Sequence, residues 1–591
     1  MRAGAVGLVL VLGLAGCANG FGGDGVAGFP DAGPGSGMAP GCAASIDFTP
    51  LDPVARPGAT VRAIAHVAGA SGVLGYHWQV LFNGAVVEAT PVPPDGASID
   101  FPAATAGVYV VDVSVTGSPE PCQQGIGSVN VRVPGAQSEF MRLRVVPPRS
   151  AAIPPLERLV EVKGGAPADL GFINLDPGSI VTPMVTGPGG GVPAYLQFSP
   201  GSAPDAIVEG FSDGLGAASV RLVLGQYSVL VVPSSAGLAP RRFAAWSPGA
   251  ALRLDAGLPI TGTVLIVRDP LDVPLEGATV RFAIDGVPST LATTGADGSF
   301  ALRAAPGAIV TVEVTPLAAS GLPRLLATSQ SFALAMPFQI RYAANVAPVD
   351  LAGTKVKRAG VARPGARVTV VGSLAAIGTV TAGTSMVATG QVQLAAIAGP
   401  GGVLPTTLVP SGALSAVVEV APGDLAVIAL DTGAGAPANL DTAGPQLITT
   451  AVLDDHGAGL PGAVLELVPT GALAMATAPT LRISAASAGA IATTLPAGGR
   501  YELRFQDPAG RSAPLVVADR AITAFASSYT LPPAVQIRGT LRRGGTQTLA
   551  GTSVQILCEA CSGIARSRPL VEVVSDAAGR FVLAVPDPGT R

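Results

Sequence analysis

Histidine and cysteine, which often supply a catalytic base, a nucleophile or a metal ligand, are scarce in this chain of 591 residues, with 3 His and 5 Cys. His66 and His77 lie in alternating runs typical of strands. His456 lies in the turn Asp454-Asp455-His456-Gly457, where we expect it to face solvent. A Ser/His/Asp triad would need one of these histidines beside its partners. The sequence therefore predicts no catalytic residue, no metal site and no cofactor, and we expect that the chain is not an enzyme.

Cys17 ends a pattern typical of a bacterial signal peptide with a lipobox. Met1-Arg2 is positively charged, Ala3 to Gly13 is uncharged and apolar, and Leu14-Ala15-Gly16-Cys17 follows. The apolar run is shorter than the about 20 residues that a membrane-spanning helix needs. We therefore predict that residues 1–17 are a leader and that the Cys17 thiol carries a diacylglyceryl group, which anchors the chain durably when further acyl chains are present.

Ala18 follows the predicted lipidation site. The start of the chain resembles enterobacterial lipoproteins, in which Asp at this position favours retention in the inner membrane. The resemblance implies a cell-envelope protein anchored to the outer membrane, either periplasmic or exposed on the surface. Residues 18–41 are rich in Gly, Ala and Pro, and are predicted to form a flexible linker.

Four cysteines remain, an even number that suggests disulfides in an oxidising compartment. Of the three possible pairings we favour Cys42 with Cys122, and Cys558 with Cys561. The pair Cys558-Glu559-Ala560-Cys561 could also be a redox motif or half of a zinc site. A zinc site needs two further ligands, and no histidine lies nearby in the sequence, so a disulfide that closes a short loop is preferred.

The composition favours several small domains of short strands. Apolar residues make up 48% of the chain and aromatic residues 4%, while 77 Gly and 54 Pro supply frequent turns. The length predicts roughly four to six domains, and therefore several hydrophobic cores. Charged residues are only 13%, and the net charge of −4 shows no basic stripe, so nucleic acid is not an expected partner.

Residues 42–135 alternate like a β-sandwich, with Tyr76-His77-Trp78 in one strand-like run and Ala106 to Val115 in another. These runs resemble the polycystic-kidney-disease type of immunoglobulin-like module. That family continues its tryptophan strand as Trp-Asp-Phe-Gly-Asp-Gly, whereas Gln79 to Gly84 follows Trp78 here. Residues 136–258 hold further strand-like runs, and are expected to form a β domain of unknown family.

An internal repeat begins with Thr261-Gly262-Thr263-Val264, continues through Pro274 to Val280, and ends with the turn Thr294 to Phe300. This pattern resembles the carboxypeptidase regulatory-like domain, a transthyretin-like or starch-binding-like β-sandwich. The resemblance implies such domains at residues 259–345, 446–533 and 534–591. The second copy diverges, because Ser487-Ala488-Gly489 replaces its Asp-Gly turn. Residues 346–445 are expected to form another β-sandwich.

The third copy stops soon after Phe581 to Val585, so it looks incomplete. A truncated reading frame or a shortened fold is the preferred explanation. The alternative is a sheet edge that a strand of another protein completes.

The sequence thus predicts an all-β chain of tandem β-sandwiches that is a non-catalytic, lipid-anchored structural or adhesive scaffold of the cell envelope. Its expected partners are the membrane, through the lipid on Cys17, and an envelope protein or a glycan. A carbohydrate-binding lipoprotein is the first alternative, with Trp246 as the candidate stacking residue because Trp78 is expected in a core. An unrecognised envelope enzyme, with its catalytic domain in residues 136–258 or 346–445, is the second.

Overall fold

The computed structural model consists almost entirely of β-strands, which confirms the predicted all-β class of tandem sandwiches. It describes residues 8–12, 48–49, 55, 57–65, 74–92, 98–117, 125–135, 137–151, 153–200, 206–268, 271–307, 309–557 and 568–590. Within these ranges no helix is long and apolar enough to cross a membrane. The helical segments are α1 (Gly471–Met475) and the 3-10 turns η1 (Arg149–Ala151), η2 (Ala318–Ser320), η3 (Ala344–Val346), η4 (Pro400–Gly402), η5 (Ser487–Gly489), η6 (Ile522–Ala524) and η7 (Pro588–Thr590).

The first sandwich has a core drawn from residues 55–133, on which Trp78 packs half-buried. Its first sheet contains β1 (Leu8–Leu12), β2 (Phe48–Thr49), β3 (Ala59–Ala65), β6 (Thr90–Val92) and β7 (Ser98–Ala103). Its second sheet contains β4 (Leu74–Phe82), β5 (Ala85–Val87), β8 (Gly107–Gly117) and β9 (Gly125–Val133). In the full-length chain β1, which belongs to the predicted leader, pairs in parallel with β3.

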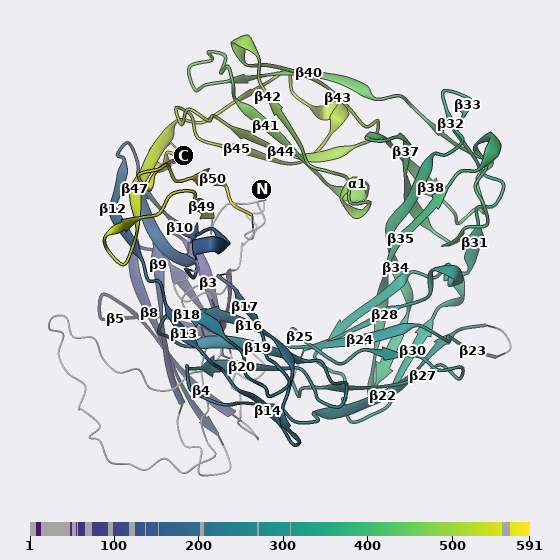
Figure 1. Cartoon of the computed structure of the whole chain (residues 1–591), viewed down its shortest axis with the longest axis horizontal. Helices are drawn as coiled ribbons and strands as arrows, with labels where there is room; N and C mark the ends of the chain where they lie inside the picture. The colour runs from purple at the N-terminus through teal and green to yellow at the C-terminus, as the bar shows by residue number, and fades with distance from the viewer. Residues whose placement is uncertain are drawn as a thin grey trace.

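The remaining sandwiches follow one another around a ring, and the two ends of this series meet in one shared sandwich (Figure 1). We call it the closing sandwich. One of its sheets has the order β11-β10-β49-β50, and the other joins β12, β47, β48 and β51. Its strands are β10 (Ser138–Val146), β11 (Leu156–Lys163), β12 (Ala168–Leu175), β47 (Ala534–Arg543), β48 (Gln547–Thr548), β49 (Ser553–Leu557), β50 (Val571–Val574) and β51 (Arg580–Pro586).

The core of the closing sandwich draws on both ends of the series. Residues 138–175 contribute the buried side chains Met141, Leu143, Val145, Ile153, Val160, Val162, Ile173 and Leu175. These side chains pack against ten others from residues 534–585. The segment at 534–591 that looked incomplete therefore obtains its missing strands from this same chain. Residues 136–258 do not form one domain, because residues 138–175 belong to this core and residues 181–254 belong to another.

The sandwich at residues 179–255 is the smallest unit of the ring. Its main sheet has the order β17-β16-β19-β20, formed by β16 (Ala194–Pro200), β17 (Val208–Phe211), β19 (Tyr227–Pro233) and β20 (Arg241–Trp246). The opposite layer holds β13 (Ser179–Val181), β14 (Val185–Gly187), β15 (Gly190–Gly191), β18 (Val220–Leu222) and β21 (Leu252–Arg253). Phe198, Tyr227 and Trp246 fill the space between the layers.

The next sandwich starts at β22, where the predicted repeat begins, and Phe300 is buried in its core as expected. Gly298 has φ +73° in the turn before Phe300, a conformation that glycine adopts without strain. The strands are β22 (Leu258–Ile266), β23 (Val273–Pro274), β24 (Thr279–Ile284), β25 (Val287–Pro288), β26 (Ala292–Thr293), β27 (Ser299–Ala304), β28 (Val310–Thr315), β29 (Arg324–Ser329) and β30 (Phe338–Tyr342).

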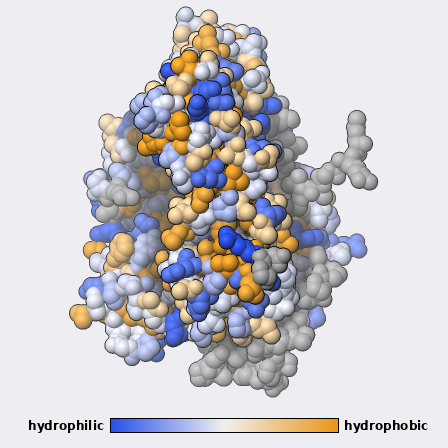
Figure 2. Space-filling model, turned by 90° about the vertical axis from the view of Figure 1, so that its right-hand side faces the viewer, coloured by the Kyte–Doolittle hydropathy of each residue, from blue (hydrophilic) through white to orange (hydrophobic). Residues whose placement is uncertain are grey.

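A long hairpin, β34 (Arg367–Ala382) and β35 (Thr384–Ile397), joins this sandwich to the one that follows. One end of β34 pairs with β30 and the other end pairs with β37, so a continuous sheet crosses the junction. The following sandwich also contains β31 (Pro348–Asp350), β32 (Lys355–Arg358), β33 (Val361–Ala362), β36 (Leu408–Pro410), β37 (Ala413–Ala421), β38 (Asp424–Asp431) and β39 (Asn439–Thr442). Figure 2 shows the side of the ring with this sandwich, where hydrophobic and hydrophilic residues are interspersed.

The last sandwich before closure shares core contacts with its predecessor, because Val371 and Val417 pack into it. At its other end Arg504 donates a hydrogen bond to the Pro569 carbonyl of the closing sandwich, at 3.0 Å. Its strands are β40 (Gln446–Leu453), β41 (Val464–Pro469), β42 (Leu481–Ser484), β43 (Ala490–Leu495), β44 (Arg500–Gln506), β45 (Leu515–Ala521) and β46 (Ser528–Thr530). Successive sandwiches on this side of the ring are therefore in direct contact.

Candidate binding surface

The residues that sequence analysis selected for covalent chemistry lie outside the described residues. They are Cys17, Cys42, Cys122, Cys558 and Cys561. Lipidation and the two disulfides therefore remain predictions. His66 also lies outside the described residues.

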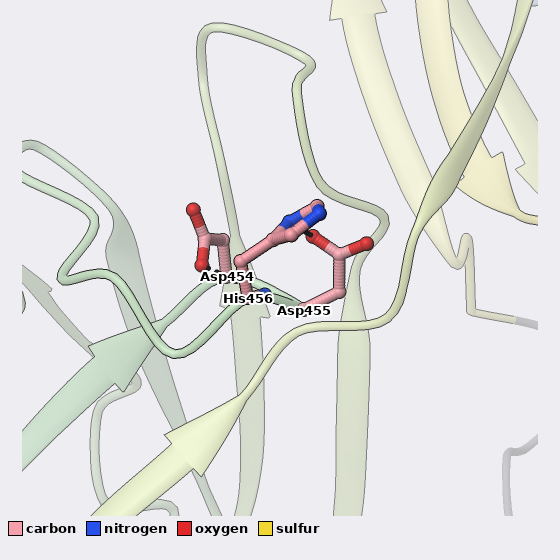
Figure 3. A group of neighbouring side chains, drawn as sticks. All are labelled: Asp454, Asp455 and His456. Atoms are coloured by element: carbon pink, nitrogen blue, oxygen red, sulfur yellow. Dashed lines mark hydrogen bonds and ion pairs between the residues drawn. The ribbon is translucent and has the colours of Figure 1, made fainter.

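Asp454, Asp455 and His456 are the one group in the described part of the chain whose His, Cys, Asp or Glu atoms lie close enough to share a metal ion (Figure 3). Asp454 Oδ1 accepts hydrogen bonds from the backbone amides of His456 and Ala458, at 3.0 and 2.8 Å. The Asp455 carboxylate pairs with His456 Nδ1 at 2.8 Å. Because these contacts are the internal bonds of a tight turn and the His456 side chain is 83% exposed, the group is explained by its local structure.

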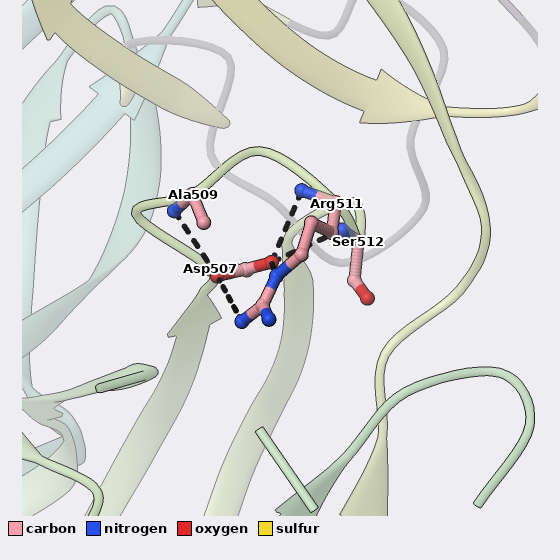
Figure 4. A network of polar contacts seen from close by, with 4 residues as sticks. All are labelled: Asp507, Ala509, Arg511 and Ser512. Atoms are coloured by element: carbon pink, nitrogen blue, oxygen red, sulfur yellow. Dashed lines mark hydrogen bonds and ion pairs between the residues drawn. The ribbon is translucent and has the colours of Figure 1, made fainter. Parts of the chain in front are cut away.

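A second polar network surrounds Asp507, in the loop between β44 and β45 (Figure 4). Its carboxylate accepts hydrogen bonds from the backbone amides of Ala509, Arg511 and Ser512 and from the Arg511 guanidinium. Burial opposes ionisation of this carboxyl, but the hydrogen bonds from Arg511 and the backbone outweigh it and hold the pKa below its ordinary value. Asp507 thus fixes a loop.

The tryptophan considered for glycan stacking is buried. Trp246 is 3% exposed, and its Nε1–H donates to the Ala250 carbonyl at 2.8 Å. Its ring lies 5.4 Å from Phe198 and 6.4 Å from Tyr227, measured between centroids. Trp246 is a core residue, so it cannot serve as the surface platform that the carbohydrate hypothesis assigned to it.

The same sheet carries a different pair of aromatic rings on its other face. Tyr195 of β16 pairs with Phe211 of β17, and the ring centroids are 5.4 Å apart. The Tyr195 hydroxyl donates to Glu209 Oε1 at 2.6 Å. Burial of Tyr195 and this hydrogen bond raise its pKa to about 12. Phe211 is 73% exposed, so a large aromatic surface faces solvent.

The aromatic pair was not found from the sequence, because Tyr195 and Phe211 become neighbours only through the register of β16 and β17. The one signal available was the alternation Ala194-Tyr195-Leu196-Gln197-Phe198, which puts Tyr195 and Gln197 on the face opposite to Leu196 and Phe198.

A cleft of about 420 Å³ lies where three sandwiches meet, between β28–β29, β35 and α1. It is lined by Thr315, Leu322, Arg324, Gln391, Gln393 and Met475, among others. Arg324 is the single ionisable residue of the lining, and it pairs with Glu313 at 2.9 Å. The lining therefore does not contain the acid and base pair that hydrolysis uses.

Comparison with known proteins gives no family assignment. No protein-family model matches the chain, and no curated protein matches it. Solved structures that are similar include the Bacillus anthracis TIE protein, with 11% identity over 64% of this chain and 69% of that one and a TM-score of 0.14. A streptococcal ancillary pilin has 10% identity over 45% and 99% of the two chains and a TM-score of 0.18.

A third similar structure is SGBP-B of the mixed-linkage glucan utilization locus of Bacteroides ovatus, in complex with a mixed-linkage heptasaccharide. Its identity is 11% over 62% of this chain and 96% of that one, with a TM-score of 0.12. TM-scores this low mean that none of these structures superimposes on the chain as a whole.

Proposed function

We propose that this chain is a non-catalytic scaffold of the cell envelope, anchored by lipid on Cys17, whose ring of β-sandwiches presents binding surfaces at a distance from the membrane. The observation that carries the proposal is the closing sandwich, because residues 138–175 and 534–585 fill one core and so close the series of domains on itself. A chain whose first and last ring segments are held together keeps its shape better than an open string of domains.

The junctions between sandwiches support a stiff scaffold. The hairpin β34–β35 continues one sheet across a junction, and Val371 and Val417 enter the next core. A rigid framework of this kind positions loops and sheet faces for binding with little loss of conformational entropy. Among the described residues, two polar groups that could suggest catalysis, at Asp454 to His456 and at Asp507, are held by the hydrogen bonds of a turn and a loop.

Anchoring is tested by fractionation of cells that express the full chain, the Cys17→Ser variant, or Ser36→Ala as a control within the linker. We expect the full chain and the control in the outer-membrane fraction, and the Cys17→Ser variant outside it. Equal membrane association of all three proteins would contradict anchoring through Cys17.

Orientation is tested by protease treatment of intact cells followed by mass spectrometry of the released peptides. Release of peptides from residues 258–557 would place the ring outside the cell, as expected for an adhesive scaffold. Release only after the envelope is opened would place it in the periplasm and contradict adhesion to other cells.

Carbohydrate binding is a second candidate function, and the observation that favours it is the exposed ring of Phe211 beside the half-buried ring of Tyr195.

A further inference from the structure

Large apolar side chains that face solvent are concentrated in the sandwich at residues 179–255. Six such side chains in the stretch 180–224 are more than 40% exposed, namely Ile180, Met184, Ile207, Phe211, Leu215 and Leu224. These side chains are spread over different elements of the sandwich: Phe211 lies on β17 of the main sheet, Ile180 lies on β13 of the opposite layer, and Leu224 lies outside both strands. The register of the main sheet shows which side chains lie beside Phe211 on its outer face.

The outer face of the sheet β17-β16-β19-β20 presents side chains in rows across the strands. In the first row Tyr195 has Phe211 on one side and Val232 on the other. In the second row Gln197 lies between Glu209 and Leu230, and Arg242 follows on β20. Rows on one face are two residues apart along a strand, which is about 7 Å. A short step therefore separates an aromatic row from a row of hydrogen-bonding groups.

We propose that this face binds a neutral oligosaccharide. The apolar C–H face of a pyranose ring packs on exposed aromatic rings, and its hydroxyls require planar donors and acceptors at the rim. Tyr195 and Phe211 provide the aromatic rings. The Gln197 amide, the Glu209 carboxylate and the Arg242 guanidinium of the second row provide the hydrogen-bond donors and acceptors. A ligand of several sugar units that runs along the strands can contact both rows.

The charges of the face favour a neutral glycan over an acidic one. Glu209 and Arg242 lie in the same row with opposite signs, and Glu209 also accepts the hydrogen bond of Tyr195. This bond holds the Tyr195 ring in place before a ligand arrives, which lowers the entropic cost of binding.

A protein partner fits this face less well. A stable protein interface buries about 800 Å² on each side around an apolar centre that is depleted of charge. Here the row next to the aromatic pair carries Glu209 and Arg242, and both residues are exposed. The open sheet face suits a chain ligand that runs along the strands, from one row to the next.

The proposal rests on the non-catalytic binding role proposed above. Affinity gel electrophoresis tests it, with the full chain carrying Cys17→Ser so that the protein is not lipidated. The probes are hydroxyethyl cellulose, mixed-linkage β-glucan, glucomannan, xylan and starch as neutral polysaccharides, with alginate as an acidic one. We expect at least one neutral polysaccharide to retard the protein, and Phe211→Ala to weaken that binding at least tenfold. Tyr195→Ala should weaken it as well.

The matched control is Leu224→Ala, which removes a side chain that is 86% exposed in the same sandwich but lies outside the four strands of this sheet. It should leave the retardation unchanged. Because Phe211 is also largely exposed, its loss should leave the circular dichroism spectrum and the melting temperature of the protein unchanged.

The proposal would be overturned if no neutral polysaccharide retarded the protein. It would also be overturned if the Phe211→Ala variant were retarded as strongly as the protein with Phe211 in place. Retardation by alginate alone would also overturn it. None of these results would contradict the envelope-scaffold proposal, because cell fractionation and protease treatment test that proposal separately.

Discussion

Replacement of Leu143 by Ala tests whether the two ends of the ring depend on each other for folding. Leu143 of β10 lies directly opposite Ile556 of β49, and both side chains are fully buried. The two residues are separated by most of the ring along the chain, yet they share one core with Leu583 of β51. A cavity at position 143 should therefore destabilise strands near the carboxyl end.

The size of the effect follows from the burial of Leu143. Replacement of a fully buried leucine by alanine costs about 2–5 kcal/mol, depending on how far the cavity collapses. At about 3 kcal/mol, opening of the closing sandwich becomes about 100-fold more frequent, since about 1.4 kcal/mol corresponds to a factor of ten. Amides of β47 and β51, which pair with each other, should exchange with solvent faster by this factor.

Hydrogen exchange read by mass spectrometry resolves this effect by segment. In the Leu143→Ala variant we expect faster exchange in β10, β47, β49 and β51, and unchanged exchange in β40–β45. Leu224→Ala, at an exposed position, should change none of these segments. Faster exchange confined to β10 and β11, with β47 and β51 as slow as before, would refute the shared core.

Three further changes probe other parts of the fold. Asp507→Asn should remove a pH-dependent part of the stability. The lowered pKa of Asp507 stabilises the fold above the unfolded-state pKa of about 4, and this contribution is lost as pH falls through the folded-state pKa. The melting temperature should therefore fall less between pH 7 and pH 3 in the variant than in the parent chain. Gly262→Ala would place a Cβ 2.3 Å from the Phe338 carbonyl oxygen. We expect the free energy of unfolding to fall by about 1–3 kcal/mol and hydrogen exchange to be faster in β22 and β30. Unchanged exchange would contradict the close parallel pairing of these two strands. Tyr342→Phe removes a buried hydroxyl that donates to a backbone carbonyl at 3.1 Å. Urea unfolding of the full chain should show a loss of about 1 kcal/mol in the transition that includes β30, whereas no loss would mean that the bond adds nothing.

Local patterns in the sequence were sufficient to predict the fold class and several of the strands. Alternation around Ile260 and the turn before Phe300 correspond to β22 and to the entry of Phe300 into the core. Such features depend on residues a few positions apart, where the period of two and the preference of glycine for positive φ apply.

Long-range pairing could not be predicted in this way. The parallel pairing of β12 with β47 joins residues such as Asp169 and Arg538, which are 369 positions apart, and nothing in either strand specifies the other. The same limit explains the assignment of residues 136–258 to one domain. For the same reason the neighbouring rings of Tyr195 and Phe211 could not be predicted. Trp246 was considered for the surface, although it is buried, because composition does not reveal which face of a sheet a side chain occupies.

Closure of the ring is the central claim, and a disulfide between positions 169 and 538 tests it most directly. Asp169 and Arg538 are neighbours on parallel strands, and their exposed side chains form an ion pair at 3.2 Å. Adjacent strands lie about 4.8 Å apart, within the range that a disulfide spans. After mild oxidation of the Asp169→Cys, Arg538→Cys double variant, peptide mapping should find the two positions linked within a protein that migrates as a monomer. Positions that stay unlinked, or that are linked only between two chains, would contradict a chain that closes on itself.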